Sequence, residues 1–112
     1  MEVSATDRYA GISARKVRLV LEHLPGQSVE AALHLLRFLP SPHAKVVAKV
    51  VKSAAANAEN NFAADPDRLY VKRAVADEGR RMKRFRPAGR GRIHAYQRRT
   101  SHITIIVDER GN

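Results

Sequence analysis

Residues 79–103 read GRRMKRFRPAGRGRIHAYQRRTSHI, and the rest of the chain is arranged around this one-sided run of charge. No Asp or Glu occurs between residues 79 and 107. The stretch contains nine basic residues, namely Arg80, Arg81, Lys83, Arg84, Arg86, Arg90, Arg92, Arg98 and Arg99. The whole chain has 21 basic and 11 acidic residues, so its net charge of +10 comes almost wholly from this segment. Because mutual repulsion opposes compact burial of such a segment, we expect a polyanionic partner, and specifically nucleic acid.

The segments on both sides of the basic stretch have the alternating pattern of core strands. Before it, residues 69–77 alternate, and their predicted inward side chains are Leu69, Val71 and Val75. After it comes a strand rich in β-branched residues, with an apolar face of Ile103, Ile105 and Val107. The simplest connection between two such strands is an antiparallel hairpin that continues past the domain. Its turn is predicted near Pro87, Gly89 and Gly91.

The predicted hairpin suits RNA in its length and chemistry. An arm of about ten residues reaches roughly 30 Å, whereas a compact chain of this length has a radius of gyration of about 13 Å. Arginine holds phosphate with two parallel hydrogen bonds and stacks on bases, which favours structured RNA over simple charge neutralisation. Phe85 and Tyr96 either stack on exposed bases or pack across the ribbon.

The remainder of the chain predicts a single α+β domain over residues 1–112. Weak alternation predicts a strand at residues 2–10, and apolar residues at helical spacing predict three helices at residues 13–24, 28–39 and 41–60. The helix N-caps are predicted to be Ser13, Ser28 and Ser41, the last with Pro42 at the first helical position.

Two further groups of basic residues lie on predicted helix surfaces. The first helix carries Arg15, Lys16 and Arg18, and the third carries Lys45, Lys49 and Lys52. Either group alone is typical of a solvated helix face. Beside a phosphate-binding arm, both groups become candidate secondary contacts to RNA.

Several function classes are excluded by composition and spacing. The chain has no Cys, which excludes disulfides, thiol catalysis and Cys-ligated zinc and fits a reducing cytosol. Its five His residues show no metal-ligand spacing, and no Walker-type phosphate loop occurs. No apolar run approaches the roughly 20 residues that span a bilayer. We therefore expect no cofactor, no metal site, no membrane partner and no enzymatic activity.

The sequence closely resembles the bacterial form of large-subunit ribosomal protein family twenty-two. The resemblance covers nearly the whole chain and rests on SARKVR at 13–18, SAAANAENN at 53–61, LYV at 69–71, DEG at 77–79, KRFRP at 83–87, GR at 91–92 and RTSHI at 99–103. The chain departs from the family pattern at Arg80, where proline is common in the family.

This resemblance implies a three-stranded antiparallel sheet, three helices and a long protruding β-hairpin at about residues 79–103. It implies a cytoplasmic ribosomal protein that binds large-subunit ribosomal RNA, aids subunit assembly and contacts neighbouring ribosomal proteins. The hairpin tip is then expected to line the polypeptide exit tunnel, beside the nascent polypeptide and near the site of macrolide antibiotics. The tip residues so implied are Met82, Lys83, Arg84, Pro87, Ala88, Gly89, Arg90, Gly91 and Arg92.

Two other function classes are weaker alternatives. Residues 24–27 could form the turn of a DNA-binding helix-turn-helix, but the following helix carries only Arg37 and His34 against Glu30, too little positive charge for a recognition helix. A protein that coats anionic membranes needs a sustained apolar stripe, which residues 80–99 do not have.

Overall fold

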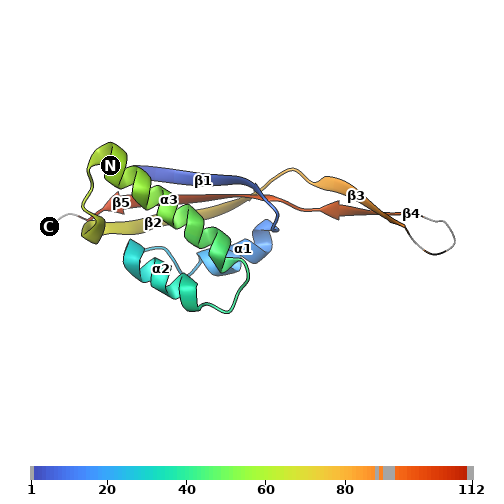
Figure 1. Ribbon diagram of the computed structural model, residues 1–112, viewed down its shortest axis with the longest axis horizontal. Coiled ribbons are helices and arrows are strands. Elements are labelled where there is room, and N and C mark those ends of the chain that lie inside the picture. Colours follow the sequence, from blue (N-terminus) through green and yellow to red (C-terminus); the bar gives the residue numbers. More distant parts are fainter. Residues whose placement is uncertain (1, 88, 90–92, 111–112) are drawn as a thin grey trace.

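The computed structural model describes residues 2–87, 89 and 93–110 and has the predicted α+β architecture (Figure 1). The predicted order of strand, three helices, strand, basic hairpin and strand is confirmed. The elements are β1 (Glu2–Ala10), α1 (Ala14–Leu21), α2 (Val29–Phe38), α3 (Ala44–Phe62), the 3₁₀ turn η1 (Pro66–Arg68), β2 (Leu69–Glu78), β3 (Met82–Pro87), β4 (Ile93–Arg98) and β5 (Ser101–Glu109).

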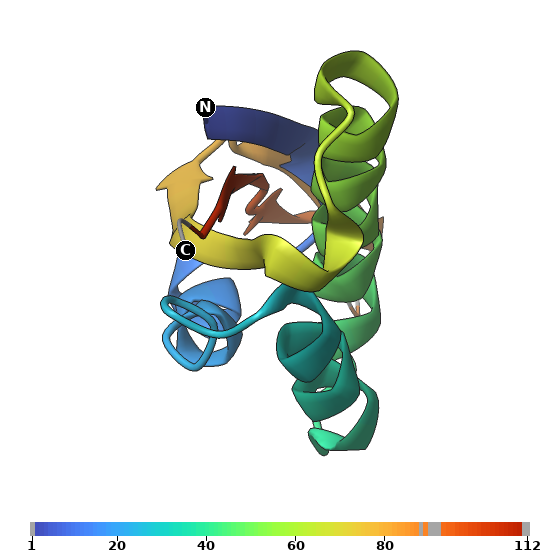
Figure 2. The same cartoon turned by 90° about the vertical axis from the view of Figure 1, so that its left-hand side faces the viewer.

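The core lies between the three-stranded sheet and the helices that cover one of its faces. The strand order is β1-β5-β2, and β5 pairs antiparallel with both neighbours. Helix α3 packs against β1 and β5, α1 against β2, and α2 against α3 (Figure 2). The predicted inward residues of the central strand, Ile103, Ile105 and Val107, are fully buried. Every other residue of β5 therefore contributes to the core, as period-two alternation requires.

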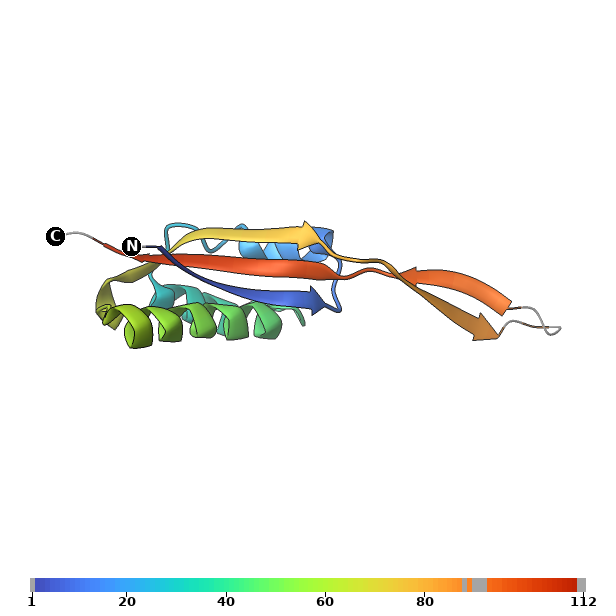
Figure 3. The same ribbon diagram turned by 90° about the horizontal axis from the view of Figure 1, so that it is seen from above.

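The hairpin strands leave this body along the direction of β2 and β5 and form a separate two-stranded sheet (Figure 3). The molecule is consequently long and thin, with extents of 67 × 27 × 17 Å. Its radius of gyration is 17.1 Å, compared with about 13 Å for a compact chain of this length. The predicted protruding hairpin is therefore confirmed.

The structure differs from prediction at two helix ends. Helix α1 ends at Leu21 rather than Leu24 because the chain turns to pair with β2, where Gly26 donates its backbone N–H to Val71 O at 2.8 Å. Gly26 has a φ of 86°, which favours glycine. Helix α3 starts at Ala44, because Ser41 and Pro42 form a turn in which Ser41 Oγ accepts from the N–H of His43 at 3.3 Å.

The predicted alternation of β2 is correct only in its first half. Leu69 and Val71 are buried as expected, but the register with β5 shifts between Val71 and Arg73. A bulge of this kind inserts one extra residue and reverses the side-chain faces beyond it. Ala76 is therefore buried, and Val75 is only half-buried.

Replacing Ser28 with alanine should destabilise the protein by about 1 kcal/mol because Ser28 Oγ accepts from the N–H of Ala31 at 3.1 Å and caps α2. Ser13 is the matched control, since it occupies the N-cap of α1 but its side chain makes no capping hydrogen bond. Urea unfolding should show a clearly smaller loss for Ser13→Ala. Equal losses would mean that the Ser28 hydrogen bond contributes no stability.

Candidate nucleic-acid interface

The basic segment folds as the predicted antiparallel hairpin. Its pairing runs from Met82 opposite Arg98 to Pro87 opposite Ile93, with Arg84 opposite Tyr96 between them. Of the candidate tip and RNA-binding residues, Ala88, Arg90, Gly91 and Arg92 lie outside the described residues.

The base of the hairpin is held by short contacts between its two arms. The N–H of Gly79 donates to Thr100 O at 2.9 Å, and the hydroxyl of Thr100 donates to Arg80 O at 2.7 Å. One step farther out, Arg81 Nη1 donates to Gln97 Oε1 at 3.4 Å. Thr100 is buried, and its side-chain hydrogen bond links the two arms where they leave the sheet. The hairpin therefore starts from a packed, hydrogen-bonded base.

The charged side chains that the structure describes along the hairpin are exposed. They are Arg80, Arg81, Lys83, Arg98 and Arg99. Phe85 is also 65% exposed, so its ring is available to an external partner rather than covered by the ribbon. The structure places the backbones of Met82, Arg84, Arg86 and Pro87 on β3. An exposed ribbon that carries cations and an open aromatic ring is well suited to RNA phosphates and unstacked bases.

The predicted secondary contacts occupy two separate places on the body. Arg15 and Lys16 are exposed on α1, and Lys45, Lys49 and Lys52 are exposed on α3, where they line a hollow beside Arg37 of α2. Arg18 differs from the others because its Nε and Nη2 donate to Ala76 O at 3.0 and 2.7 Å. Its guanidinium therefore ties α1 to β2, a structural contact that the sequence pattern did not indicate.

The side chain of Lys16 on α1 lies beside the hairpin base. A hollow of about 610 Å³, called the junction hollow below, is lined by Gly11, Ile12, Ser13, Lys16, His43, Gln97, Arg98 and Arg99. Sequence reasoning named Lys16, Arg98 and Arg99 separately and missed that they meet. It also missed His43 and Gln97. The order of elements gave no signal for this, because residues 16 and 98 come together only through the packing of α1 against the sheet.

The paired acidic residues lie at the opposite end of the sheet. Lys72 pairs with Glu2 and lies 3.8 Å from Asp108 Oδ2, and Arg68 pairs with Glu109 at 3.4 Å. The hydrogen bond to Glu2, with the charge of that carboxylate, raises the pKa of Lys72. The backbone N–H of Glu109 lowers the pKa of Asp108. Lys72 and Arg68 are thus paired with acidic side chains, whereas the hairpin stretch carries nine basic residues and no acidic ones, which makes the hairpin end the more electropositive.

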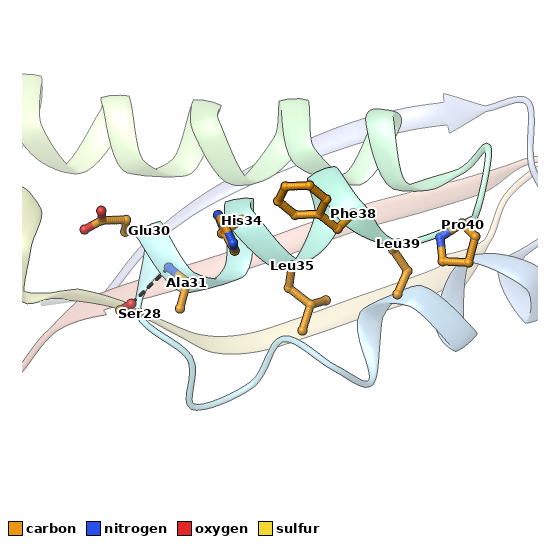
Figure 4. Close-up of a pocket in the computed structure, with 8 residues that line it drawn as sticks. All are labelled: Ser28, Glu30, Ala31, His34, Leu35, Phe38, Leu39 and Pro40. Carbon is orange, nitrogen blue, oxygen red and sulfur yellow. Dashed lines mark hydrogen bonds between the residues drawn. The ribbon is translucent and has the colours of Figure 1, made fainter.

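A second surface feature is an apolar hollow along α2, which the sequence analysis did not single out. It has a volume of about 790 Å³ and is lined by Ser28, Glu30, Ala31, His34, Leu35, Phe38, Leu39 and Pro40 (Figure 4). Phe38 is 69% exposed, and its ring centroid lies 4.8 Å from that of His34. The sequence did offer one signal for this hollow. Phe38 is a large aromatic residue that lies off the apolar face formed by Val29, Ala32 and Leu36.

Within the described residues, no group of three or more His, Asp or Glu residues is placed to hold a metal ion. Among the described helices, none is long and apolar enough to cross a membrane.

Comparison with known proteins gives a consistent result. The family model described as "Ribosomal protein L22p/L17e" matches residues 5–108. The chain is 54% identical over 110 residues to "Large ribosomal subunit protein uL22" of Thermoanaerobacter sp. (strain X514), covering 98% of this chain and 99% of the relative. Proteins with the same name are similar to it in Dehalococcoides mccartyi (strain CBDB1), at 52% identity over 96% of this chain and 98% of the relative, and in Clostridium novyi (strain NT), at 46% over 98% and 99%.

Proposed function

Because this chain belongs to the ribosomal protein L22p/L17e family, we propose that it is a structural constituent of the large ribosomal subunit that binds ribosomal RNA through its hairpin. It acts in the cytoplasm as part of the ribosome, aids subunit assembly and is not an enzyme. The observation that carries the proposal is the two-stranded basic ribbon, which extends from a body whose described core does not include it.

The charge distribution supports RNA as the partner of the ribbon. Residues 80–99 contribute nine of the basic residues and no acidic ones, and the described cations among them are exposed. Phosphate contacts of this kind supply most of the sequence-independent affinity for nucleic acid. The positive ribbon would enter folded RNA, while the near-neutral body stays at its surface.

The tip is proposed to line the polypeptide exit tunnel. Family likeness gives this role to residues 82–92, with the nascent polypeptide as a neighbour and the macrolide site close by. The geometry supports this in one respect, since β3 and β4 extend away from the body (Figure 3). A narrow ribbon can pass between RNA helices where a globular domain cannot.

Neighbouring ribosomal proteins are proposed as the partners of the apolar hollow on α2. Its lining is mostly apolar, and exposed Phe38 resembles the aromatic anchors enriched at protein interfaces. Phosphate-rich RNA suits the hairpin end better than this surface. The body would thus contact protein and RNA through different faces.

Co-sedimentation tests the proposed function. The full-length protein, mixed with large subunits stripped of their own copy, should sediment with them and remain bound at moderate salt, because a ribbon threaded through RNA must be withdrawn along its length. Affinities for protein-free large-subunit RNA and for duplex DNA, measured at matched salt, provide the comparison. Tighter binding to duplex DNA would instead support the helix-turn-helix alternative.

A further inference from the structure

We propose that the junction hollow holds one phosphodiester group of the RNA and thereby ties the hairpin base to the body. This inference rests on the proposed RNA-binding function. It adds a specific site, assembled from both parts of the molecule, to what would otherwise be a diffuse basic ribbon.

The first support is the charge of the lining. Lys16 comes from α1, Arg98 ends β4, and Arg99 follows it, so three cations from two distant parts of the chain line one space. Among the described residues that line the hollow, none is an acid that could neutralise them. Cations gathered with like charges are costly unless an anion joins them, and Arg and Lys are the side chains that hold phosphate.

The second support is the backbone at the same place. Helix α1 begins at Ala14, its N-cap Ser13 makes no side-chain capping hydrogen bond, and its first turn carries no acidic residue. The first N–H groups of a helix have no partner within the helix, and the positive end of its dipole favours an anion there. The N-cap Ser13 and Lys16 both line the hollow, so the helix end and the side chains beside it favour the same charge.

The third support is the way the hairpin meets the body. A Cβ atom built on Gly11 would stand 3.9 Å from Nη2 of Arg98, so the guanidinium of Arg98 lies directly against the loop that precedes α1. The hollow of about 610 Å³ has room for a phosphate and part of the attached nucleotide. A phosphodiester seated here contacts both sides of the junction and so fixes the direction in which the hairpin leaves.

The test asks whether the body and the hairpin share one phosphate. Lys16→Gln and Arg99→Gln, made in the full chain, should each lower affinity for protein-free large-subunit RNA about tenfold and reduce the slope of log affinity against log salt by roughly 0.7–0.9. The double variant should fall well short of the roughly hundredfold loss that independent contacts would give. Arg73→Gln, an exposed cation on β2 away from the hollow, is the matched control and should change little.

A second measurement, of backbone amide signals, asks whether RNA itself occupies the junction hollow. Amide signals of Ala14 and Arg15 should shift when the RNA is added to the wild-type protein, and not when it is added to the double variant. Losses that simply add would overturn the shared site. Lys16→Gln and Arg99→Gln variants that bind RNA as tightly as the control would also overturn the proposal. This holds even if inorganic phosphate alone shifted the amide signals of Ala14 and Arg15. Failure of the wild-type protein to bind the RNA at all would instead contradict the proposed function.

Discussion

Deleting residues 80–99 should leave a folded body. Glu78 pairs with Ser101, so the deletion leaves Gly79 and Thr100 as a two-residue turn between β2 and β5. Glycine at the first position of such a turn suits the type II′ geometry that hairpins favour. Every residue of the described core lies outside the deleted stretch. Circular dichroism should therefore retain the helical signal, and loss of that signal would contradict an independently stable body.

The same deletion should remove most of the affinity for RNA. It takes away nine basic residues, and each neutralised phosphate contributes roughly 0.7–0.9 to the salt slope. We expect the slope of log affinity against log salt to fall by about 4 or more, with a loss of at least about a thousandfold at physiological salt. Filter binding or fluorescence anisotropy on protein-free large-subunit RNA would measure both quantities.

The control for this deletion keeps the hairpin and neutralises the body. Replacing Lys45, Lys49 and Lys52 with glutamine removes exposed charge from α3 without touching the core. Its slope should change by no more than about 3, since three phosphate contacts at most are lost. If this variant lost more affinity than the deletion, the body rather than the hairpin would hold the RNA.

Replacing half-buried Gly79 with alanine should destabilise the protein by about 1–3 kcal/mol, as overpacking does against well-packed neighbours. A Cβ atom at residue 79 would stand 2.5 Å from Oγ1 of Thr100 and 3.3 Å from its backbone carbon. Thr100 is buried, and its hydroxyl donates to Arg80 O, so neither group can move without loss. Urea unfolding should show a lower midpoint with an unchanged slope.

Gly89→Ala is the matched control because a Cβ atom built on Gly89 meets nothing within 4 Å. Both substitutions add one methyl group to a glycine of the basic segment, so they differ mainly in what surrounds that methyl group. A loss of stability for Gly89→Ala as large as that for Gly79→Ala would mean that chain entropy, and not the contact with Thr100, sets the cost.

Much of the fold was predictable because its signals are local. The capping role of Ser28, the alternation of Ile103, Ile105 and Val107, and the concentration of arginine between two strands can each be read within about ten residues. Apart from the start of α3, where Ser41 and Pro42 form a local turn, the errors arose where distant segments impose a conformation. Gly26 pairs with Val71, which ends α1 early. The bulge before Arg73 places Ala76 in the core instead of the predicted Val75.

The candidate interface likewise has one part that the sequence predicts and one part that it does not. The charge of the hairpin follows from composition, since the 12 basic residues outside it already offset the 11 acidic residues of the chain and leave none to neutralise its nine cations. The junction hollow does not follow from composition. Lys16 and Arg99 are 83 positions apart, and they meet only because α1 packs against β2 while β4 leads into β5.

The class of fold, the protruding hairpin and an anionic partner could be predicted from the sequence, because periodicity and runs of like charge are carried by neighbouring residues. Which basic residues lie together depended on the tertiary structure. It ties Arg18 to Ala76 O and leaves Lys16 facing Arg98 and Arg99. A binding site depends on distances between side chains, and those distances are set by packing between elements far apart in the chain.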